Sequence, residues 1–118
     1  LTQTYWQAFA DSRLGLPFIS WATRQNVDPA YHIFPVVLPI GFQRQLFIDK
    51  LRESGIQTSI HYPPIHLFKY YRQIYPNIRL PHTETFAELE LTLPLYPGLS
   101  SSQQTFVIER INQVLSTH

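Results

Sequence analysis

The run His61-Tyr62-Pro63-Pro64-Ile65-His66 brings together, in one short loop, side chains that could do chemistry. Its two imidazoles and its phenol can donate or accept hydrogen bonds and protons. The two prolines fix the backbone between them and push the residues before them into extended conformations. A stiff polar loop loses little conformational entropy when it orders around a ligand, so this run is the first candidate for a functional site.

Residue types alone leave other interpretations of the loop open. A loop histidine such as His61 can be satisfied by a backbone carbonyl, and Tyr62 can pack on the prolines with only its hydroxyl in water. His66 can start or cap the following helix. A metal site is disfavoured, because His61 and His66 lie five positions apart across a proline pair, with no cysteine or close acidic residue as a third ligand.

Composition restricts the classes of function. The chain has 118 residues, 44% of them hydrophobic, which suits one domain with a real core. A net charge of +1 without a basic block predicts neither nucleic acid nor an anionic membrane as a partner. No stretch approaches the roughly 20 apolar residues of a membrane helix, and no signal peptide is visible, so we expect a cytoplasmic location. The absence of cysteine excludes disulfides and cysteine-based zinc sites.

Two further features of composition bear on the organisation of the protein. The chain contains no methionine and begins within a predicted helix. We therefore expect residues 1–118 to be a single domain cut from a larger protein. Lysine is rare as well, because only Lys50 and Lys69 occur.

Glycine, proline and the spacing of apolar residues predict the elements that position the loop. The helical patterns cover Thr4–Ser12 with an end near Gly15, Phe42–Ser54, Leu67–Tyr75, Thr83–Thr92, and a last helix from Ser100 to about Leu115. Patterns of β-branched and aromatic residues predict strands at Phe18–Trp21, Tyr31–Leu38 and Gln57–Ile60, with a turn at Asn26–Pro29.

This order of elements predicts an α+β domain: a small, mostly antiparallel sheet of about three strands with helices packed on one face. Pro35 predicts an edge position or a bulge for its strand, and His32 is expected to be a satisfied residue of the same strand. The run Leu93–Gly98 is expected to pack on the sheet and to guide the chain into the last helix, where Ser100 and Gln103 form a capping-box pattern. His82 and His118 are expected at the surface.

Several of these motifs, in this order, resemble the C-terminal domain of the DegT/DnrJ/StrS-type sugar aminotransferases. The resemblance covers roughly residues 31–115. The segments that carry it are Tyr31–Phe34, Gly55–Leu67 with the histidine loop, Leu80-Pro81 followed by Glu84, Leu93–Leu99, and Val107–Ile111.

The resemblance implies a specific function. Members of this family are pyridoxal-phosphate enzymes of the aspartate-aminotransferase fold, type I, and they transfer an amino group, commonly from glutamate, to a keto-sugar carried by a nucleotide. The chain would be the small domain, and the large domain of the same polypeptide would hold the cofactor. The parent would be a bacterial homodimer that makes amino sugars for cell-surface polysaccharides or antibiotics. A wall of its cleft, formed by His61, Tyr62, His66 and Arg72, would contact the nucleotide sugar.

The lysines of the chain do not match the needs of such a cofactor. A pyridoxal enzyme requires a Schiff-base lysine and a carboxylate beside the pyridinium nitrogen. Lys50 lies on the polar side of a predicted helix and Lys69 lies in the helix after the loop, so neither has the desolvated surroundings that activate a lysine. We therefore expect no catalytic residue, no bound pyridoxal phosphate and no transaminase activity in this chain alone.

The same resemblance leaves alternatives open. One variant of the family lacks the lysine and removes a hydroxyl group, and the deciding position would lie upstream of this chain. Other members are regarded as pleiotropic regulators, which would make the domain a binding or regulatory module without transaminase activity. A purely structural role in dimer contact is a third alternative. For Arg72, the competing interpretation is a solvated surface arginine.

Overall fold

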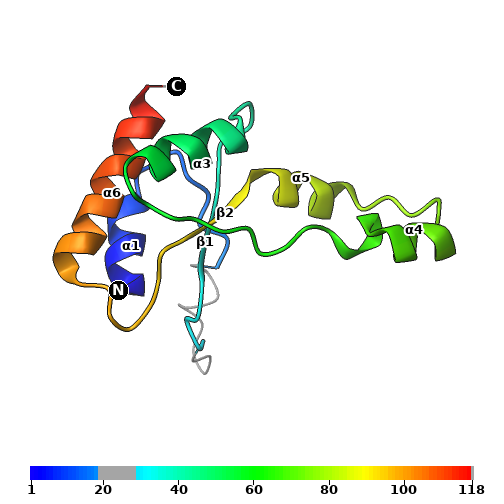
Figure 1. Cartoon of the computed structure of the whole chain (residues 1–118), viewed down its shortest axis with the longest axis horizontal. Coiled ribbons are helices and arrows are strands. Elements are labelled where there is room, and N and C mark those ends of the chain that lie inside the picture. The colour runs from blue at the N-terminus through cyan, green and yellow to red at the C-terminus, as the bar shows by residue number, and fades with distance from the viewer. Residues whose placement is uncertain (19–28, 118) are drawn as a thin grey trace.

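The computed structural model describes residues 1–18 and 29–117. The elements, labelled as in Figure 1, are α1 (Thr2–Phe9), β1 (Phe34–Val37), α3 (Arg44–Glu53), the 3-10 turn η1 (Ile65–Leu67), α4 (Lys69–Ile74), α5 (Pro81–Leu89), β2 (Glu90–Leu93) and α6 (Ser101–Ser116). Most of the predicted strand Phe18–Trp21, most of the predicted turn Asn26–Pro29, and His118 lie outside the described residues.

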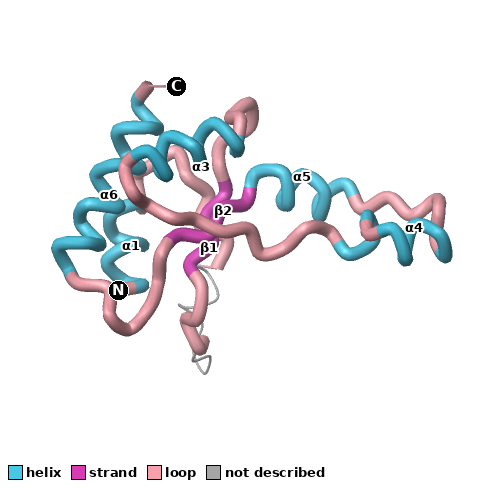
Figure 2. The backbone as a smooth tube through the Cα atoms, viewed as in Figure 1, coloured by secondary structure: helices cyan, strands magenta, loops and turns pink. Residues whose placement is uncertain are grey.

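The molecule divides into a body and an arm (Figures 1 and 2). The body consists of α1, α3, α6 and the two strands. The arm consists of residues 62–89, with η1, α4 and α5, and it projects away from the body. The radius of gyration is 15.7 Å and the longest extent is 48 Å, whereas a compact domain of this length has a radius of gyration of about 13–14 Å. The arm therefore gives the molecule an elongated shape.

The sheet of the body is antiparallel and, within the described residues, contains only β1 and β2. The predicted α+β class is confirmed, and the described residues hold two strands where about three are predicted. Side chains alternate between the two faces of a strand, so the register places the pairs Phe34–Leu93 and Val36–Leu91 on one face. The opposite face carries Pro35, Val37, Glu90 and Thr92.

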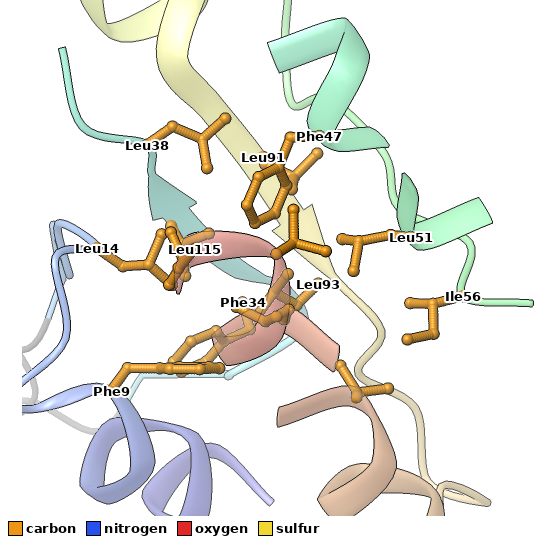
Figure 3. Packing of buried hydrophobic residues seen from close by; sticks show 14 of the residues in the cluster. Phe9, Leu14, Phe34, Leu38, Phe47, Leu51, Ile56, Leu91, Leu93 and Leu115 are labelled. Carbon is orange, nitrogen blue, oxygen red and sulfur yellow. The ribbon is translucent and has the colours of Figure 1, made fainter. Parts of the chain in front are cut away.

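The first face of the sheet packs on the helices (Figure 3). Tyr5 and Phe9 of α1, Phe47 and Leu51 of α3, and Ile111 of α6 are each at most 1% exposed. The cluster continues through Leu14, Phe34, Val36, Leu38, Ile48, Ile56, Leu91, Leu93, Val107, Val114 and Leu115. Because its strand residues all belong to one face, the prediction of helices packed on one side of the sheet is confirmed.

The predicted strand Gln57–Ile60 is wrong, because only Ser59 pairs, in an isolated bridge with Thr92. The next antiparallel partner on one side of that bridge is Pro94, which has no N–H to extend a ladder. On the other side, the His61 N–H binds the side chain of Glu90 instead of a backbone carbonyl. Both neighbouring positions of the bridge are thus blocked.

The predicted helix Thr83–Thr92 is also wrong at its end. The helix α5 stops at Leu89, and Glu90 is extended, with φ −66° and ψ 138°. Burial of Leu91 and Leu93 against Val36 and Phe34 overrides the local helical pattern, because only a strand presents both leucines to the core.

Two elements near the N-terminus are shorter than predicted. The helix α1 ends at Phe9 rather than near Gly15, because the Ser12 hydroxyl binds the Phe9 carbonyl and accepts the Leu14 N–H, and so competes with the helical bonds. The strand β1 begins only at Phe34, since Tyr31 adopts a left-handed φ of 48°. His32 is therefore not a sheet residue, contrary to the prediction, and its side chain is exposed.

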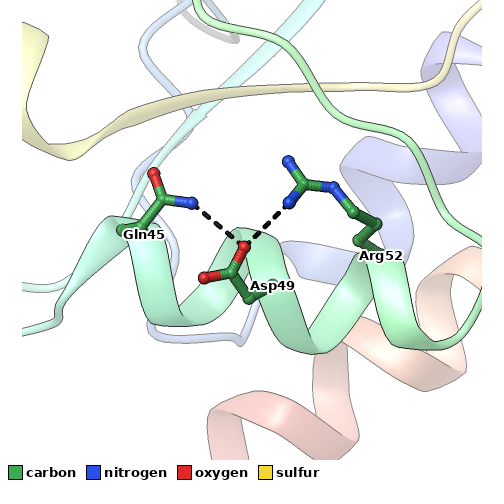
Figure 4. A network of polar contacts seen from close by, with 3 residues as sticks. All are labelled: Gln45, Asp49 and Arg52. Atoms are coloured by element: carbon green, nitrogen blue, oxygen red, sulfur yellow. Dashed lines mark hydrogen bonds and ion pairs between the residues drawn. The ribbon is translucent and has the colours of Figure 1, made fainter.

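The helices α3 and α6 closely match their predictions. Gly55 follows α3 with a φ of 77°, as expected of a residue just past a helix end, and Ser100 and Gln103 form the predicted capping box of α6. On the outer face of α3, Asp49 accepts hydrogen bonds from Gln45 and Arg52, each at 3.0 Å (Figure 4). These partners lie three and four positions away, as helical geometry requires.

None of the helices in residues 1–18 and 29–117 combines the length and the apolar character that crossing a bilayer requires. Within the same residues, no three side chains of histidine, cysteine, aspartate or glutamate gather closely enough to hold a metal ion.

Candidate functional site

His61 stands at the point where the body meets the arm. The bridge between Ser59 and Thr92 aligns the chain with β2 in the antiparallel sense. Residues two positions apart on a strand share one face, so His61 lies on the face of Ser59 and Glu90 on the face of Thr92. Ser59, His61, Glu90 and Thr92 therefore meet on the face of the sheet that is turned away from the hydrophobic cluster. The His61 Nδ1 lies 2.9 Å from the Thr92 Oγ1 and 3.4 Å from the Ser59 Oγ.

Glu90 organises this polar group from within the body, where it is only 1% exposed. Its Oε2 accepts the backbone N–H of His61 at 3.0 Å, and its Oε1 accepts the hydroxyl of Thr92 at 2.6 Å. Thr92 is itself 4% exposed. The backbone of this segment is secured as well, because the Arg44 guanidinium binds the carbonyls of Ala87 and Glu90. The imidazole of His61 thus rests on a buried, hydrogen-bonded support.

A groove of about 740 Å³ opens beside this support. His61 and Thr92 line it together with His32, Tyr96 and Gln103. The Tyr62 ring stands edge-on to the His61 imidazole, with centroids 4.8 Å apart and an interplanar angle of 86°. Among the described residues no hydrogen-bond partner lies on the Nε2 of His61, so that atom is available to a ligand.

His66 belongs to the arm, in the turn η1, and its Nε2 lies 2.8 Å from the Glu84 Oε1. The same carboxylate oxygen accepts the backbone N–H of Leu80 at 3.0 Å. The pKa of Glu84 lies below its ordinary value of 4.5. The largest cause is the hydrogen bond from the Leu80 N–H, and the next is the hydrogen bond with His66. This contact joins the loop before α4 to the first turn of α5, so it fixes the fold of the arm.

The four residues predicted to form the cleft wall do not meet at one point. Tyr62 is 72% exposed, and it lines a shallow hollow of about 490 Å³ on the arm together with His66. His61 lines the groove of the body instead. Arg72 lies in α4, exposed, and its guanidinium has no hydrogen bond or ion pair with the described residues.

The sequence pattern of the DegT/DnrJ/EryC1/StrS aminotransferase family matches residues 1–112. The chain belongs to this aminotransferase family. As a DegT/DnrJ/EryC1/StrS domain, it has the expected relatives among solved structures.

Helicobacter pylori PseC, an aminotransferase involved in the biosynthesis of pseudoaminic acid, superposes with a TM-score of 0.87 at 21% identity, over 99% of this chain and 31% of its own. DesV from S. venezuelae, solved in complex with a ketimine intermediate, gives 0.81 at 32% identity, over 97% and 30%. NtdA from Bacillus subtilis, solved with its cofactor PMP bound, gives 0.79 at 26% identity, over 98% and 27%. The chain therefore spans less than a third of the length of these aminotransferases.

Sequence reasoning missed the two residues that support His61 in this family member. The helical pattern over Thr83–Thr92 places Glu90 and Thr92 at the end of a helix, where they would not share one face as they do on a strand. A signal for them does exist, because Glu90-Leu91-Thr92-Leu93 alternates polar and apolar residues before a proline, as a half-buried strand does. Glu84, the partner of His66, was noted only as part of a family motif.

The run Leu93–Gly98 begins with the last residue of β2 and leads into α6, as expected. The Pro94 carbonyl accepts the hydroxyl of Tyr5 at 2.9 Å, which ties the run to α1. Burial, with a smaller contribution from Tyr96, raises the pKa of Tyr5. The run thus forms one rim of the groove beside His61 and anchors it to the core of the aminotransferase domain.

Proposed function

We propose that this chain is the small, C-terminal domain of a pyridoxal-phosphate-dependent aminotransferase that acts on keto-sugars linked to nucleotides. The proposal rests on the family match over residues 1–112, together with the short length of the chain. The chain covers only 27% to 31% of the length of related aminotransferases. The catalytic cycle would then require a larger partner domain of the same polypeptide, and the parent would work as a homodimer.

Within that enzyme, His61 is the residue of this chain that best suits contact with the substrate. Its ring is held by Thr92 on one nitrogen and leaves the other free in a groove. Tyr62 extends the same surface, since its ring contacts the imidazole and remains largely exposed. His66 and Arg72 would contribute from the arm only where the partner domain brings the substrate over it.

The residues of this chain do not fit the role of holding pyridoxal phosphate. Lys69 is exposed in α4, and Lys50 lies half-buried on α3. Neither lysine lines the groove beside His61 or the hollow on the arm, and neither is paired with a carboxylate among the described residues. When bound in the parent, the cofactor carries the amino group, and its lysine would come from the partner domain.

The arm has the surface expected of a segment that packs on that larger domain. Tyr62, Ile65, Tyr70, Ile74 and Tyr75 are between 48% and 72% exposed. Monomeric soluble proteins rarely expose large apolar patches to water, and such patches mark sites of association. The occupant that we propose is the remaining two thirds of the aminotransferase polypeptide, since the related chains are about three times as long.

The full-length parent protein provides the test of the enzymatic role. Purified with pyridoxal phosphate, it should show a spectral change on addition of glutamate and should then transfer the amino group to UDP-linked or dTDP-linked keto-deoxyhexoses. His61→Ala should raise the KM for the sugar about tenfold, as loss of one hydrogen bond predicts. His82→Ala, on the exposed side of α5, is the matched control and should leave KM unchanged.

Two outcomes would reject this role. If the parent has no upstream lysine in a cofactor site and shows no spectral change, it would be either the variant that removes a hydroxyl group or a regulatory module. A Schiff-base absorption band formed by the 118-residue chain alone, and abolished by changing Lys50 or Lys69, would show that the cofactor site lies in this chain after all.

A separate experiment tests the docking of the arm. Tyr71→Asp places a charge on the arm, where Tyr71 is 40% exposed. It should lower the Tm of the full-length parent and leave the Tm of the 118-residue chain unchanged. An equal effect in both proteins would mean that Tyr71 stabilises the arm itself rather than an interface.

A further inference from the structure

Glu90 is a carboxylate that the body buries without a cationic partner. Within residues 1–18 and 29–117, the ion pairs involve Asp49 and Glu84 and none reaches Glu90. The nearby Arg44 binds backbone carbonyls, not the carboxylate. Burying an acidic group is unfavourable unless hydrogen bonds compensate. Both oxygens of Glu90 have such bonds, and both bonds lead to His61, one directly and one through Thr92.

The protons of this chain of bonds can be assigned one by one. A threonine hydroxyl carries a single proton, and Thr92 gives it to the Glu90 Oε1 at 2.6 Å. Toward His61, the Thr92 oxygen can therefore only accept. The atom 2.9 Å away, the His61 Nδ1, must be the donor. In the neutral imidazole, the proton then resides on Nδ1, and Nε2 keeps its lone pair.

We propose that Glu90 and Thr92 are positioning residues that fix the tautomer of His61, so that its Nε2 accepts a hydrogen bond from the ligand. This inference rests on the proposed function, because it concerns the same groove. It specifies the chemistry of the group bound there, which must be a hydrogen-bond donor. A sugar hydroxyl or amino group meets that requirement, whereas a fully ionised phosphate oxygen does not.

The fold explains why this arrangement holds. The bridge at Ser59 fixes the register of His61 against β2, and the Tyr62 ring stands against one side of the imidazole. A half-turn of the ring would place Cδ2 where Nδ1 now lies, so it would lose the Thr92 bond and leave a buried hydroxyl oxygen without its donor. The backbone bond from His61 to Glu90 prevents the loop from moving away.

The Glu90→Gln variant tests the proton assignment directly. The glutamine oxygen must serve the His61 N–H, so its NH₂ group faces the Thr92 oxygen and donates to it. The hydroxyl proton of Thr92 no longer has an acceptor on residue 90 and turns to the His61 Nδ1. The tautomer of His61 should therefore invert, with the proton moving from Nδ1 to Nε2.

The readout is the ¹⁵N spectrum of histidine in the 118-residue chain, recorded at about pH 8.5, where histidine side chains are ordinarily neutral. Protonated and unprotonated ring nitrogens have well-separated shifts, and His61→Asn assigns the signals. Thr92→Val, which keeps shape and removes the hydroxyl, should give a mixture of both tautomers. An unmodified chain with the proton on Nε2, or a Glu90→Gln spectrum without inversion, would overturn the proposal.

Kinetics of the full-length parent separate this inference from the proposed function. With UDP-linked and dTDP-linked keto-deoxyhexoses, Glu90→Gln should raise KM about tenfold with little change in kcat, because Nε2 then presents a proton to a donor. If His61→Ala raises KM while Glu90→Gln leaves the tautomer unchanged, the positioning role fails and the proposed function stands. If the tautomer inverts but neither variant changes KM, His61 does not contact the sugar.

Discussion

The body and the arm each join a histidine to a glutamate, with opposite consequences. In the body, Glu90 is 1% exposed and reaches the His61 ring through Thr92. In the arm, the His66 ring binds Glu84 directly, and the glutamate side chain is 31% exposed. The buried system orients a ring whose second nitrogen stays free. The accessible system uses the Nε2 of its histidine to close a loop, so that nitrogen is not left for a ligand.

The same contrast extends to the packing of the two regions. The 16 described residues of the buried apolar cluster all lie outside residues 62–89, although the arm contains many apolar side chains. The helix α4 has no buried residue, and α5 buries only Ala87. A segment with few buried contacts opens locally at low free energy. The body should therefore carry the stability of the isolated chain, and the arm should await a surface on which to pack.

The largest expected effect compares two isoleucines on helices. Ile111 in α6 is 0% exposed, and Ile74 in α4 is 48% exposed. Ile111→Ala removes buried methyl groups and leaves a cavity, so it should lower the free energy of unfolding by about 2–5 kcal/mol. Ile74→Ala should change it by less than about 0.5 kcal/mol. Urea denaturation of the 118-residue chain measures both, and equal losses would refute the division into body and arm.

The second prediction compares the two glutamates. Glu90→Ala leaves the buried backbone N–H of His61 without its acceptor and removes the acceptor that the Thr92 hydroxyl uses, which should reduce stability by about 1–3 kcal/mol. Glu84→Ala removes a water-accessible contact and should have a much smaller effect on global unfolding. The same denaturation experiment applies, with Glu88→Ala on the exposed surface of α5 as control. A larger loss of stability from Glu84→Ala than from Glu90→Ala would show that the contact in the arm contributes more to the stability of the chain than the buried contacts of Glu90.

Elements that depend on residues close together in the sequence could be predicted, and elements that depend on contacts between distant residues could not. The helices α3 and α6 were predicted closely, because their stop signal at Gly55 and their capping box at Ser100 act within a few residues. The strand β2 was not, because its reason to be extended is contact with β1, more than 50 positions away in the chain. Two local patterns compete there, the helical spacing that continues from α5 and the alternation of Glu90–Leu93, and packing against β1 decides between them.

The candidate site follows the same rule. His61 could be singled out because its loop is a local motif of imidazoles, a phenol and prolines. Its supporting carboxylate could not, since Glu90 lies 29 positions later and meets His61 only through the register of Ser59 on Thr92. The separation of His61 from His66 was equally hidden, because two residues of one motif point into different regions of the structure.

A third prediction concerns the start of α6. The Ser100 hydroxyl caps this helix, whereas α1, α3, α4 and α5 have no side-chain cap. Ser100→Ala should lower stability by about 1 kcal/mol, and Ser100→Gly by only a few tenths of that, because glycine tolerates the cap conformation. Thermal unfolding followed by circular dichroism measures the difference. No change in the alanine variant would mean that packing alone sets the start of α6.

The smallest effect is a local change of the arm with pH. Hydrogen bonds from the Leu80 N–H and from His66 lower the pKa of Glu84 from 4.5. A carboxyl group whose pKa is lowered in the folded state stabilises that state above its unfolded value, and the contribution is lost as pH falls through the folded value. The contact should therefore persist at neutral pH and weaken only below pH 4.5.

The amide signal of Leu80 reports this transition by NMR, with amides of α6 as an internal reference. It should titrate with a midpoint below 4.5 in the unmodified chain, and it should not titrate in that range in Glu84→Gln. A midpoint at or above 4.5 would contradict the hydrogen bond as its cause. If the α6 amides moved together with Leu80, the arm would not open independently, and the two regions would form one cooperative unit rather than a stable body with a separable arm.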